Sequence, residues 1–196
     1  SYGNDAVETV SYDPDGAKKL LEESGWTDTD GDGYVDKDGQ KLTINWLTYP
    51  TRLEQPKLAE YAQATLKDIG IDVQVNNTSD HRTFAENGDF DVYVSSTTTA
   101  PTGDPEYFFT STVVGAKNYG NYQNEEVTKL TDQLHQTFDK DERGKLAVEL
   151  QQKILDDDAF FFVSHLNMGI VTKSNVTGMA AHPCDYYEIT AELDVE

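Results

Sequence analysis

The residues best spaced to bind an ion lie in an acidic loop, residues 27–39. Three aspartates at alternate positions are followed by a glycine, an aromatic residue and a fourth aspartate: Asp28, Asp30, Asp32, Gly33, Tyr34 and Asp36. This spacing matches the calcium loop of an EF-hand, in which alternating carboxylates on a tight turn converge on one hard cation. The bidentate glutamate that closes that loop is replaced by Gly39, and a strand pattern follows in place of a helix. The loop therefore predicts a structural calcium site, and a plain acidic turn favoured by Asp and Gly is the alternative.

A second candidate site lies in residues 89–123, where a strand pattern runs into a polar loop. Phe90, Val92 and Val94 alternate with polar residues, and a run of hydroxyl residues follows at positions 95–99. Two prolines and a glycine within residues 101–105 then exclude regular structure. Aromatic residues come next: Tyr107, Phe108, Phe109, Tyr119 and Tyr122. Open α/β folds bind small molecules in such loops at the carboxyl ends of strands, although the composition fits a polar surface loop equally well.

Enzyme chemistry has little support in this sequence. The histidines His81, His135, His165 and His182 are scattered without the spacing of metal ligands. Cys184 lies close to His182 in sequence, but chain neighbours rarely face one another in an active site. The sequence contains no G-x-S-x-G, no glycine-rich phosphate loop and no C-x-x-C. We therefore predict a protein that is not an enzyme and requires no cofactor, apart from the calcium considered above.

Charge excludes some partners. The 196 residues carry 15 basic and 36 acidic side chains, a net charge of −21, which argues against binding to nucleic acid or to anionic membrane surfaces. With one cysteine the chain can form no internal disulfide. No apolar run approaches the roughly 20 residues of a membrane span. The polar first residues suggest a cut inside a longer chain, so we expect this sequence to be a piece of a larger protein.

The elements that position these residues alternate between strand and helix. Apolar periodicity predicts helices near residues 14–24, 58–69 and 80–88, and strands near 42–46, 71–75 and 90–94. Two longer helices are predicted at 127–138 and 139–154, followed by strands at 159–163 and 169–172. This order predicts an α/β fold, with a mixed, mostly parallel sheet flanked by helices in a single domain.

The order of motifs resembles the C-terminal lobe of the peptide/nickel-type solute-binding proteins of ABC importers, family 5. The resemblance is carried by YDPDGAKKLLEESGW and DTDGDGYVDKDGQKLT within residues 12–43, and by residues 57–75, 88–96, 103–109, 118–134 and 139–163. It implies one lobe of a type II periplasmic-binding-protein fold, in which two α/β lobes close on a solute. Within residues 1–196 we expect an entry helix (1–26), the acidic loop (27–40), an α/β core (41–179) and a tail (180–196) returning towards a missing N-terminal lobe.

The resemblance also implies where the solute binds. Peptide binders of the family often carry Ala-Asp-Tyr-x-(Asp/Glu)-Pro, whose first Asp holds the peptide amine, and Pro101 stands at that position here. Nickel and metallophore binders carry Ala-Pro-Tyr-Asp-Pro, which is closer to residues 100–105, but Thr102 replaces their tyrosine and Thr98 stands where they have an aromatic residue. The residues expected to line the cleft are Thr97, Thr98, Thr99, Asp104, Tyr119 and Tyr122.

The function implied is that of an extracytoplasmic component of an ABC importer, in the periplasm or as a cell-surface lipoprotein. It would bind an oligopeptide or a nickel or other metal chelate and deliver it to the permease subunits. The alternative from the residues themselves is a calcium-stabilised cell-surface interaction module centred on the acidic loop. A hydrolase is a distant third.

Overall fold

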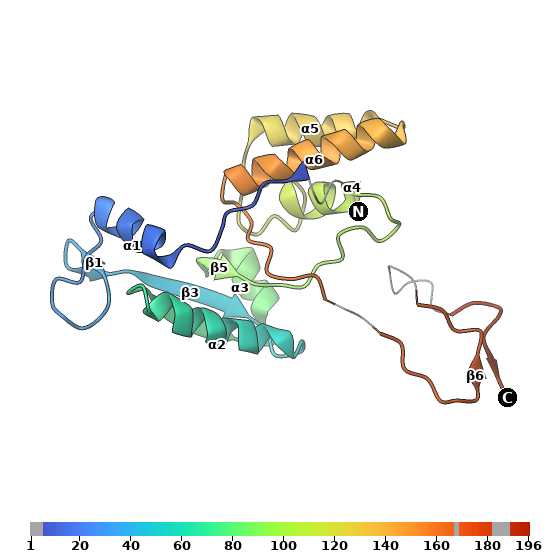
Figure 1. The fold of residues 1–196 in the computed structure, drawn as a ribbon, viewed down its shortest axis with the longest axis horizontal. Coiled ribbons are helices and arrows are strands. Elements are labelled where there is room, and N and C mark those ends of the chain that lie inside the picture. The colour runs from blue at the N-terminus through green and yellow to red at the C-terminus, as the bar shows by residue number, and fades with distance from the viewer. Residues whose placement is uncertain (1–5, 167–168, 182–188) are drawn as a thin grey trace. The chain divides into compact units, whose positions relative to one another are not determined.

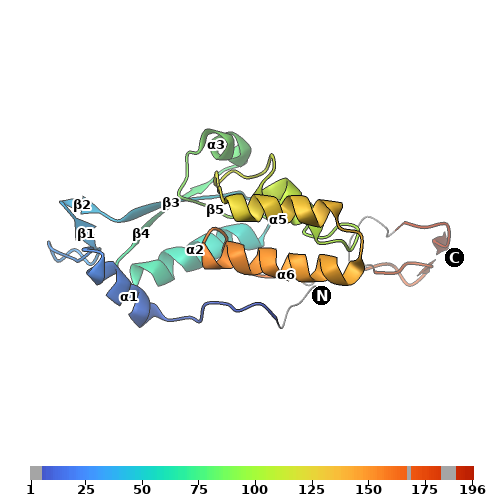
Figure 2. The same cartoon turned by 90° about the horizontal axis from the view of Figure 1, so that it is seen from above.

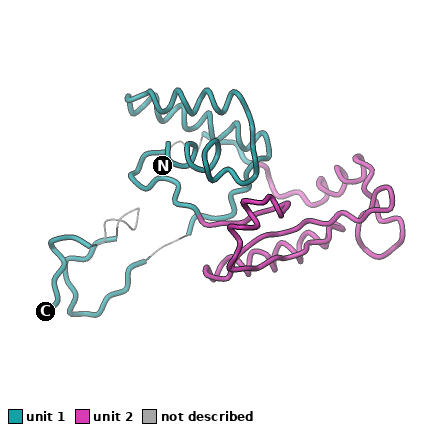
Figure 3. The backbone as a smooth tube through the Cα atoms, turned by 180° about the vertical axis from the view of Figure 1, so that it is seen from behind, with its two compact units in different colours: residues 1–9, 97–196 teal, residues 10–96 magenta. Residues whose placement is uncertain are grey.

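The computed structural model describes residues 6–166, 169–181 and 189–196, and the chain divides into two compact units. Unit 2 comprises residues 10–96, and unit 1 comprises residues 1–9 and 97–196 (Figure 3). Each unit has its own secondary structure.

Unit 2 is built on three parallel strands in the order β4–β3–β5, with these bounds: β3 Thr43–Thr48, β4 Asp72–Asn77 and β5 Val92–Tyr93. Trp46 of β3 pairs with Val75 on one side and with Val92 on the other. Each parallel neighbour is reached through a helix, because parallel strands cannot be joined by a tight turn. The first connection is α2 (Glu54–Lys67) and the second is α3 (His81–Asn87) (Figure 1). The carboxyl ends of all three strands therefore lie at one edge of the sheet.

The remaining elements of unit 2 precede this sheet. Helix α1 (Pro14–Glu23) begins as predicted, with Pro14 in its first turn and the Asp13 carboxylate accepting the N–H of Gly16 at 2.8 Å. The acidic loop leads into a short hairpin of β1 (Asp36–Lys37) and β2 (Gln40–Lys41). Leu47, Ala59 and Val73 are completely or almost completely buried, so α2 is packed on the sheet.

Unit 1 is mainly helical. Its elements are α4 (Glu106–Phe108), the π-helix η2 (Phe109–Val113), α5 (Glu125–Gln136), α6 (Lys140–Asp156), and a two-stranded antiparallel pair of β6 (Val176–Thr177) and β7 (Asp194–Val195). Helices α5 and α6 lie side by side (Figure 2). Their buried faces form one core cluster with residues of α4 and η2: Phe108, Phe109, Val113, Val127, Leu134, Leu146, Ala147, Leu150 and Ile154. Asn124 and Asp139 cap the two helices through their side-chain oxygens.

Two strand predictions in unit 1 are wrong. Residues 159–163 were predicted to form a buried strand, but they form no strand, and the Phe161 side chain is 88% exposed. The neighbouring rings of Phe160 and Phe162 instead pack edge-on against Phe108, at centroid distances of 5.8 and 5.7 Å. Residues 169–172 also form no strand, and Val171 is 96% exposed. An apolar run indicates burial of some side chains, but it does not supply a neighbouring strand to pair with.

None of the described helices is both long enough and apolar enough to cross a membrane.

Candidate functional site

The carboxyl edge of the unit 2 sheet carries a buried polar network. Thr48, the last residue of β3, is fully buried, and Gln55 at the start of α2 is 2% exposed. The Gln55 amide donates to Ser96 Oγ at 3.1 Å, and Ser96 Oγ donates to a carboxylate oxygen of Glu54 at 3.3 Å. Because buried polar groups must be hydrogen-bonded, this network holds Ser96 in place. Ser96 belongs to the run of hydroxyl residues at 95–99, which we call the hydroxyl loop.

Three rings lie at the same edge. The His81 imidazole stacks on the ring of Tyr49, with 4.2 Å between centroids, and its Nδ1 lies 2.7 Å from the Tyr93 hydroxyl. The Tyr49 hydroxyl in turn accepts the backbone N–H of Ser96 at 3.0 Å. Each of these residues lies in or after a predicted strand, at 42–46, 71–75 or 90–94, but no sequence pattern connects them. None of the three was predicted as a site residue.

Residues 97–99 of the hydroxyl loop follow this edge directly along the chain and belong to unit 1. Thr97 and Thr98 are exposed, and Thr99 is half-buried. Neither a helix nor a strand forms between β5 and Pro105, as the prolines and Gly103 predict, and Gly103 adopts the left-handed backbone (φ +77°). The threonine hydroxyls are therefore presented by irregular backbone, and their contact with a solute remains a prediction.

Asp104, a predicted ligand contact, is held by an arginine of α6. Arg143 Nη2 lies 2.6 and 2.7 Å from the two carboxylate oxygens of Asp104, and Arg143 Nε lies 3.0 Å from one of them. The same Nη2 donates to Glu106 at 2.9 Å, and Glu106 also lies 2.6 Å from the His135 ring nitrogen. Arg143 Nη1 donates to the carbonyls of Leu134 and Thr137 at the end of α5. Asp104 thus fastens the loop to the helices, whether or not it also meets a solute.

The charges of this network reinforce one another. Burial by itself raises the pKa of the Asp104 carboxyl, but the hydrogen bonds from Arg143 and from the Glu106 N–H outweigh burial and hold that pKa below its ordinary value. The pKa of Glu106 is lowered in the same way, against burial, by Arg143 and His135. Both carboxylates are therefore ionised at neutral pH. They line a hollow of about 720 Å³ that also exposes Phe138 and Lys140.

The two predicted tyrosines differ in their surroundings. Tyr119 is half-buried in a turn and has a partner of its own. Tyr122 packs edge-on against Phe160 and its hydroxyl donates to Asp157 at 2.5 Å, just beyond the end of α6. Tyr122 thus closes the loop onto the helical core. A contact of either ring with a solute remains a prediction.

Tyr122 also yields a pH-dependent prediction. Burial, followed by the hydrogen bond to Asp157, raises the pKa of Tyr122 to about 12. Because the pKa of Tyr122 is higher in the folded than in the unfolded protein, the neutral phenol stabilises the folded state. This stabilisation is fully present at pH values below the unfolded pKa of about 10, and it is lost as the pH rises from 10 to 12. We expect Tyr122→Phe to lower the free energy of unfolding by about 1 kcal/mol at pH 8, and the difference from wild type to shrink towards pH 12.

Denaturant unfolding across this pH range measures the difference. Tyr61→Phe is the matched control, because Tyr61 is 70% exposed on α2. A difference between wild type and Tyr122→Phe that stays constant from pH 8 to pH 12 would contradict the assignment of the hydrogen bond.

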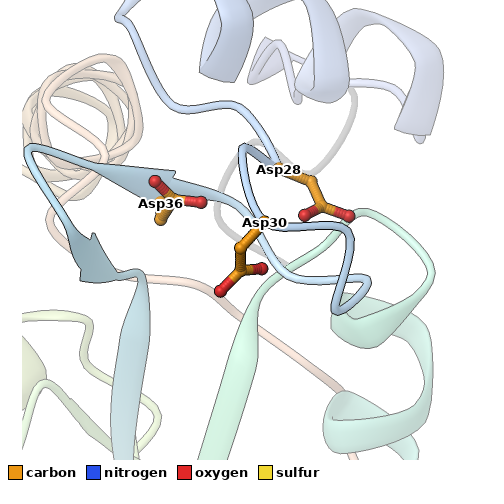
Figure 4. A group of neighbouring side chains, drawn as sticks. All are labelled: Asp28, Asp30 and Asp36. Carbon is orange, nitrogen blue, oxygen red and sulfur yellow. The ribbon is translucent and has the colours of Figure 1, made fainter.

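The acidic loop brings together three of its five predicted ligands. Carboxylate oxygens of Asp28, Asp30 and Asp36 lie within 4.8 Å of one another (Figure 4). Asp32 instead forms an ion pair with Lys41 at 2.5 Å, and the Tyr34 ring lies beneath the same ammonium at 4.3 Å.

The loop also satisfies its own carboxylates. Asp28 accepts the N–H groups of Gly31 and Gly33, and Asp36 accepts the N–H and hydroxyl of Thr29. The hydrogen bonds of the turn are therefore enough to explain why the acidic loop is rich in Asp and Gly. The calcium site remains a prediction that no observation tests.

Two of the remaining sequence candidates, His182 and Cys184, lie outside the described residues. His165 is exposed, and His135 is exposed apart from its contact with Glu106.

Comparison with known proteins identifies the relatives of this fold. A family model described as "Bacterial extracellular solute-binding proteins, family 5 Middle" matches residues 1–120. The chain belongs to this family. It is 30% identical over 189 residues to the oligopeptide-binding protein AppA of Bacillus subtilis (strain 168), and the match covers 93% of this chain and 35% of that protein.

Solved structures agree with the assignment to family 5. The nickel ABC transporter of Bacillus halodurans is 32% identical with a TM-score of 0.67, covering 78% of this chain and 32% of that one. NikA of Staphylococcus aureus in complex with Ni(L-His)2 is 27% identical with a TM-score of 0.65, covering 77% and 32%. These neighbours are type II periplasmic binding proteins, so the predicted fold class is confirmed. The relatives are binding proteins, which also supports the prediction of a non-enzyme. The family 5 chain spans about a third of the length of the relatives it matches.

Proposed function

We propose that this chain supplies one lobe of an extracytoplasmic solute-binding protein, and that the protein delivers an oligopeptide or a metal chelate to an ABC importer. The observation that carries the proposal is the family 5 match over residues 1–120. The geometry of unit 2 supports it, because side chains with hydrogen-bonding and aromatic groups gather at the carboxyl ends of its three parallel strands.

The proposed mechanism is closure of two lobes on the solute. This chain contributes one face of the cleft, a second lobe of the full-length protein contributes the other, and hinge rotation encloses the solute. Permease subunits then recognise the closed form. No cofactor takes part, and the protein works in the periplasm or as a lipoprotein at the cell surface.

The charged groups near the predicted solute contacts bear on the solute class. Pro101 takes the place of an aspartate that could hold a peptide amine, and the Asp104 carboxylate is already paired with Arg143. AppA is named as an oligopeptide binder, and the Bacillus halodurans protein as a nickel transporter. We propose that the solute is of one of these two kinds.

The proposal is tested through the predicted contacts. We expect the combined Thr97→Ala, Thr98→Ala and Thr99→Ala variant of the full-length protein to bind its peptide or nickel chelate at least about tenfold more weakly, since each lost hydrogen bond is worth about 0.5–1.5 kcal/mol. Tyr119→Ala is expected to weaken binding by a similar factor through lost ring contact. Isothermal titration measures both.

The control is Thr128→Ala, because Thr128 is exposed on α5 and its hydroxyl bonds only to its own helix. Unchanged affinity in the threonine and Tyr119 variants would remove these residues from the site.

A further inference from the structure

His81 lies where the carboxyl ends of all three strands of unit 2 meet. It is the first residue of α3, which follows β4, and it stacks on Tyr49, the residue after the end of β3. Its ring nitrogen Nδ1 contacts the hydroxyl of Tyr93, the last residue of β5. The imidazole is thus placed by three strands at the edge of the sheet where parallel α/β folds bind ligands.

The ring is held in one orientation. Its 4.2 Å stack on Tyr49 has an interplanar angle of 23°, and Tyr49 is itself buried with its hydroxyl bonded to the Ser96 backbone. The 2.7 Å contact with Tyr93 fixes Nδ1. A ligand-binding group that is fixed before binding loses little conformational freedom when a ligand arrives.

The other ring nitrogen, Nε2, has no hydrogen-bond partner among the described residues. Burial first, and the charge of Arg82 second, lower the pKa of His81, while Asp80 opposes them. The imidazole is therefore neutral at neutral pH. When Nδ1–H donates to the Tyr93 oxygen, Nε2 carries a free lone pair.

We propose that His81 Nε2 coordinates the transition metal of a chelated-metal solute directly, which makes the solute a metal chelate with an open coordination position. This inference rests on the proposed solute-binding function and assigns its solute class. The step is a ligand exchange in which the Nε2 lone pair forms a bond to the metal and one metal-bound water leaves. No proton is released, because the imidazole is already neutral.

The chemistry of the site favours a metal over a peptide carboxylate as the partner of Nε2. A metal-binding histidine usually donates its other ring N–H in a hydrogen bond that fixes the ring, as Nδ1 of His81 can do to Tyr93. Imidazole suits nickel, and a net charge of −21 attracts cations and repels carboxylates. Donation from Nε2–H to a peptide carboxylate is the competing outcome, and it requires the opposite tautomer.

The test uses the full-length protein and Ni²⁺ with one equivalent of glycine, a chelator that contains no imidazole and leaves coordination positions open. X-ray absorption of the wild-type complex is expected to show imidazole scattering, which then comes only from the protein. Isothermal titration is expected to show at least tenfold weaker binding of this probe by His81→Gln, and imidazole scattering is lost in that variant. His135→Gln, which removes an exposed histidine of unit 1, is expected to bind within twofold of wild type.

Several results would overturn the inference. The inference would be overturned if the wild-type protein bound nickel–glycine without imidazole scattering. This measurement uses the wild-type protein alone, so it does not depend on whether any variant folds. Binding by His81→Gln within twofold of wild type would also overturn the inference, as would binding of peptides but not of nickel–glycine by the wild-type protein. In these cases the solute-binding proposal stands, whereas failure of wild type to bind any peptide or nickel chelate would overturn that proposal as well.

Discussion

Replacing Arg143 with methionine is expected to lower the free energy of unfolding of unit 1 by about 2–4 kcal/mol. The Arg143 side chain is 13% exposed, and its guanidinium donates to Asp104, Glu106 and two carbonyls at the end of α5. Methionine keeps much of the aliphatic stem but leaves two carboxylates without their cation. Partial exposure of those carboxylates, 40% and 23%, keeps the loss below that of a fully buried pair. Because the folded pKa values of both carboxyls are depressed, the stabilisation is present at neutral pH and is lost as the pH falls through those values.

Native-state hydrogen exchange measures this effect unit by unit, which matters because the two units need not unfold together. The slowest amides of α5 and α6 are expected to exchange about 30 to 1,000 times faster in Arg143→Met, since about 1.4 kcal/mol corresponds to a factor of ten. Lys145→Met is the control, because its pair with Glu142 is exposed to solvent and such surface pairs contribute little to stability. Equal exchange rates in the two variants would show that the Arg143 network does not stabilise unit 1.

The second large effect is expected from Phe109→Ala in the core of unit 1. Phe109 is 2% exposed and packs edge-on against Phe108, at a centroid distance of 5.8 Å. Removing the ring leaves a cavity between η2 and its neighbours, for which we expect a loss of about 3–5 kcal/mol.

The same exchange experiment on α5 and α6 measures the loss. Phe138→Ala is the matched control, because Phe138 belongs to the same unit and is 92% exposed, so its removal is expected to change stability by less than about 0.5 kcal/mol. If the two phenylalanine variants were equally stable, the assignment of the unit 1 core would be wrong.

Periodic local patterns predicted much of unit 2. The alternating residues near 42–46 and 71–75 became β3 and β4, and the helical spacing between them became α2. Asp13, Pro14 and Asp139 mark helix starts because a cap is a local interaction within a few residues. The same reasoning failed at residues 159–163, because whether an apolar run forms a strand depends on a partner that the run does not contain.

The candidate site was less predictable, because its contacts join distant parts of the chain. Arg143 and Asp104 are 39 residues apart, and no spacing rule connects them. His81, Tyr49 and Tyr93 meet only because parallel pairing aligns three strand ends. The sequence identified the hydroxyl loop through its composition, but it did not show that Asp104 and Tyr122 are already bonded within unit 1.

The most direct test of the account is thermal unfolding of the full-length protein with a panel of di- to octapeptides, Ni²⁺, Ni²⁺ with small chelators, and Ca²⁺. A ligand that binds only the folded protein raises the unfolding midpoint. We predict a rise with nickel chelates that grows with their concentration. A rise with peptides alone would keep the solute-binding function but not the role of His81. A rise with Ca²⁺ alone, and none with any peptide or nickel chelate, would contradict the account and favour a calcium-stabilised surface module.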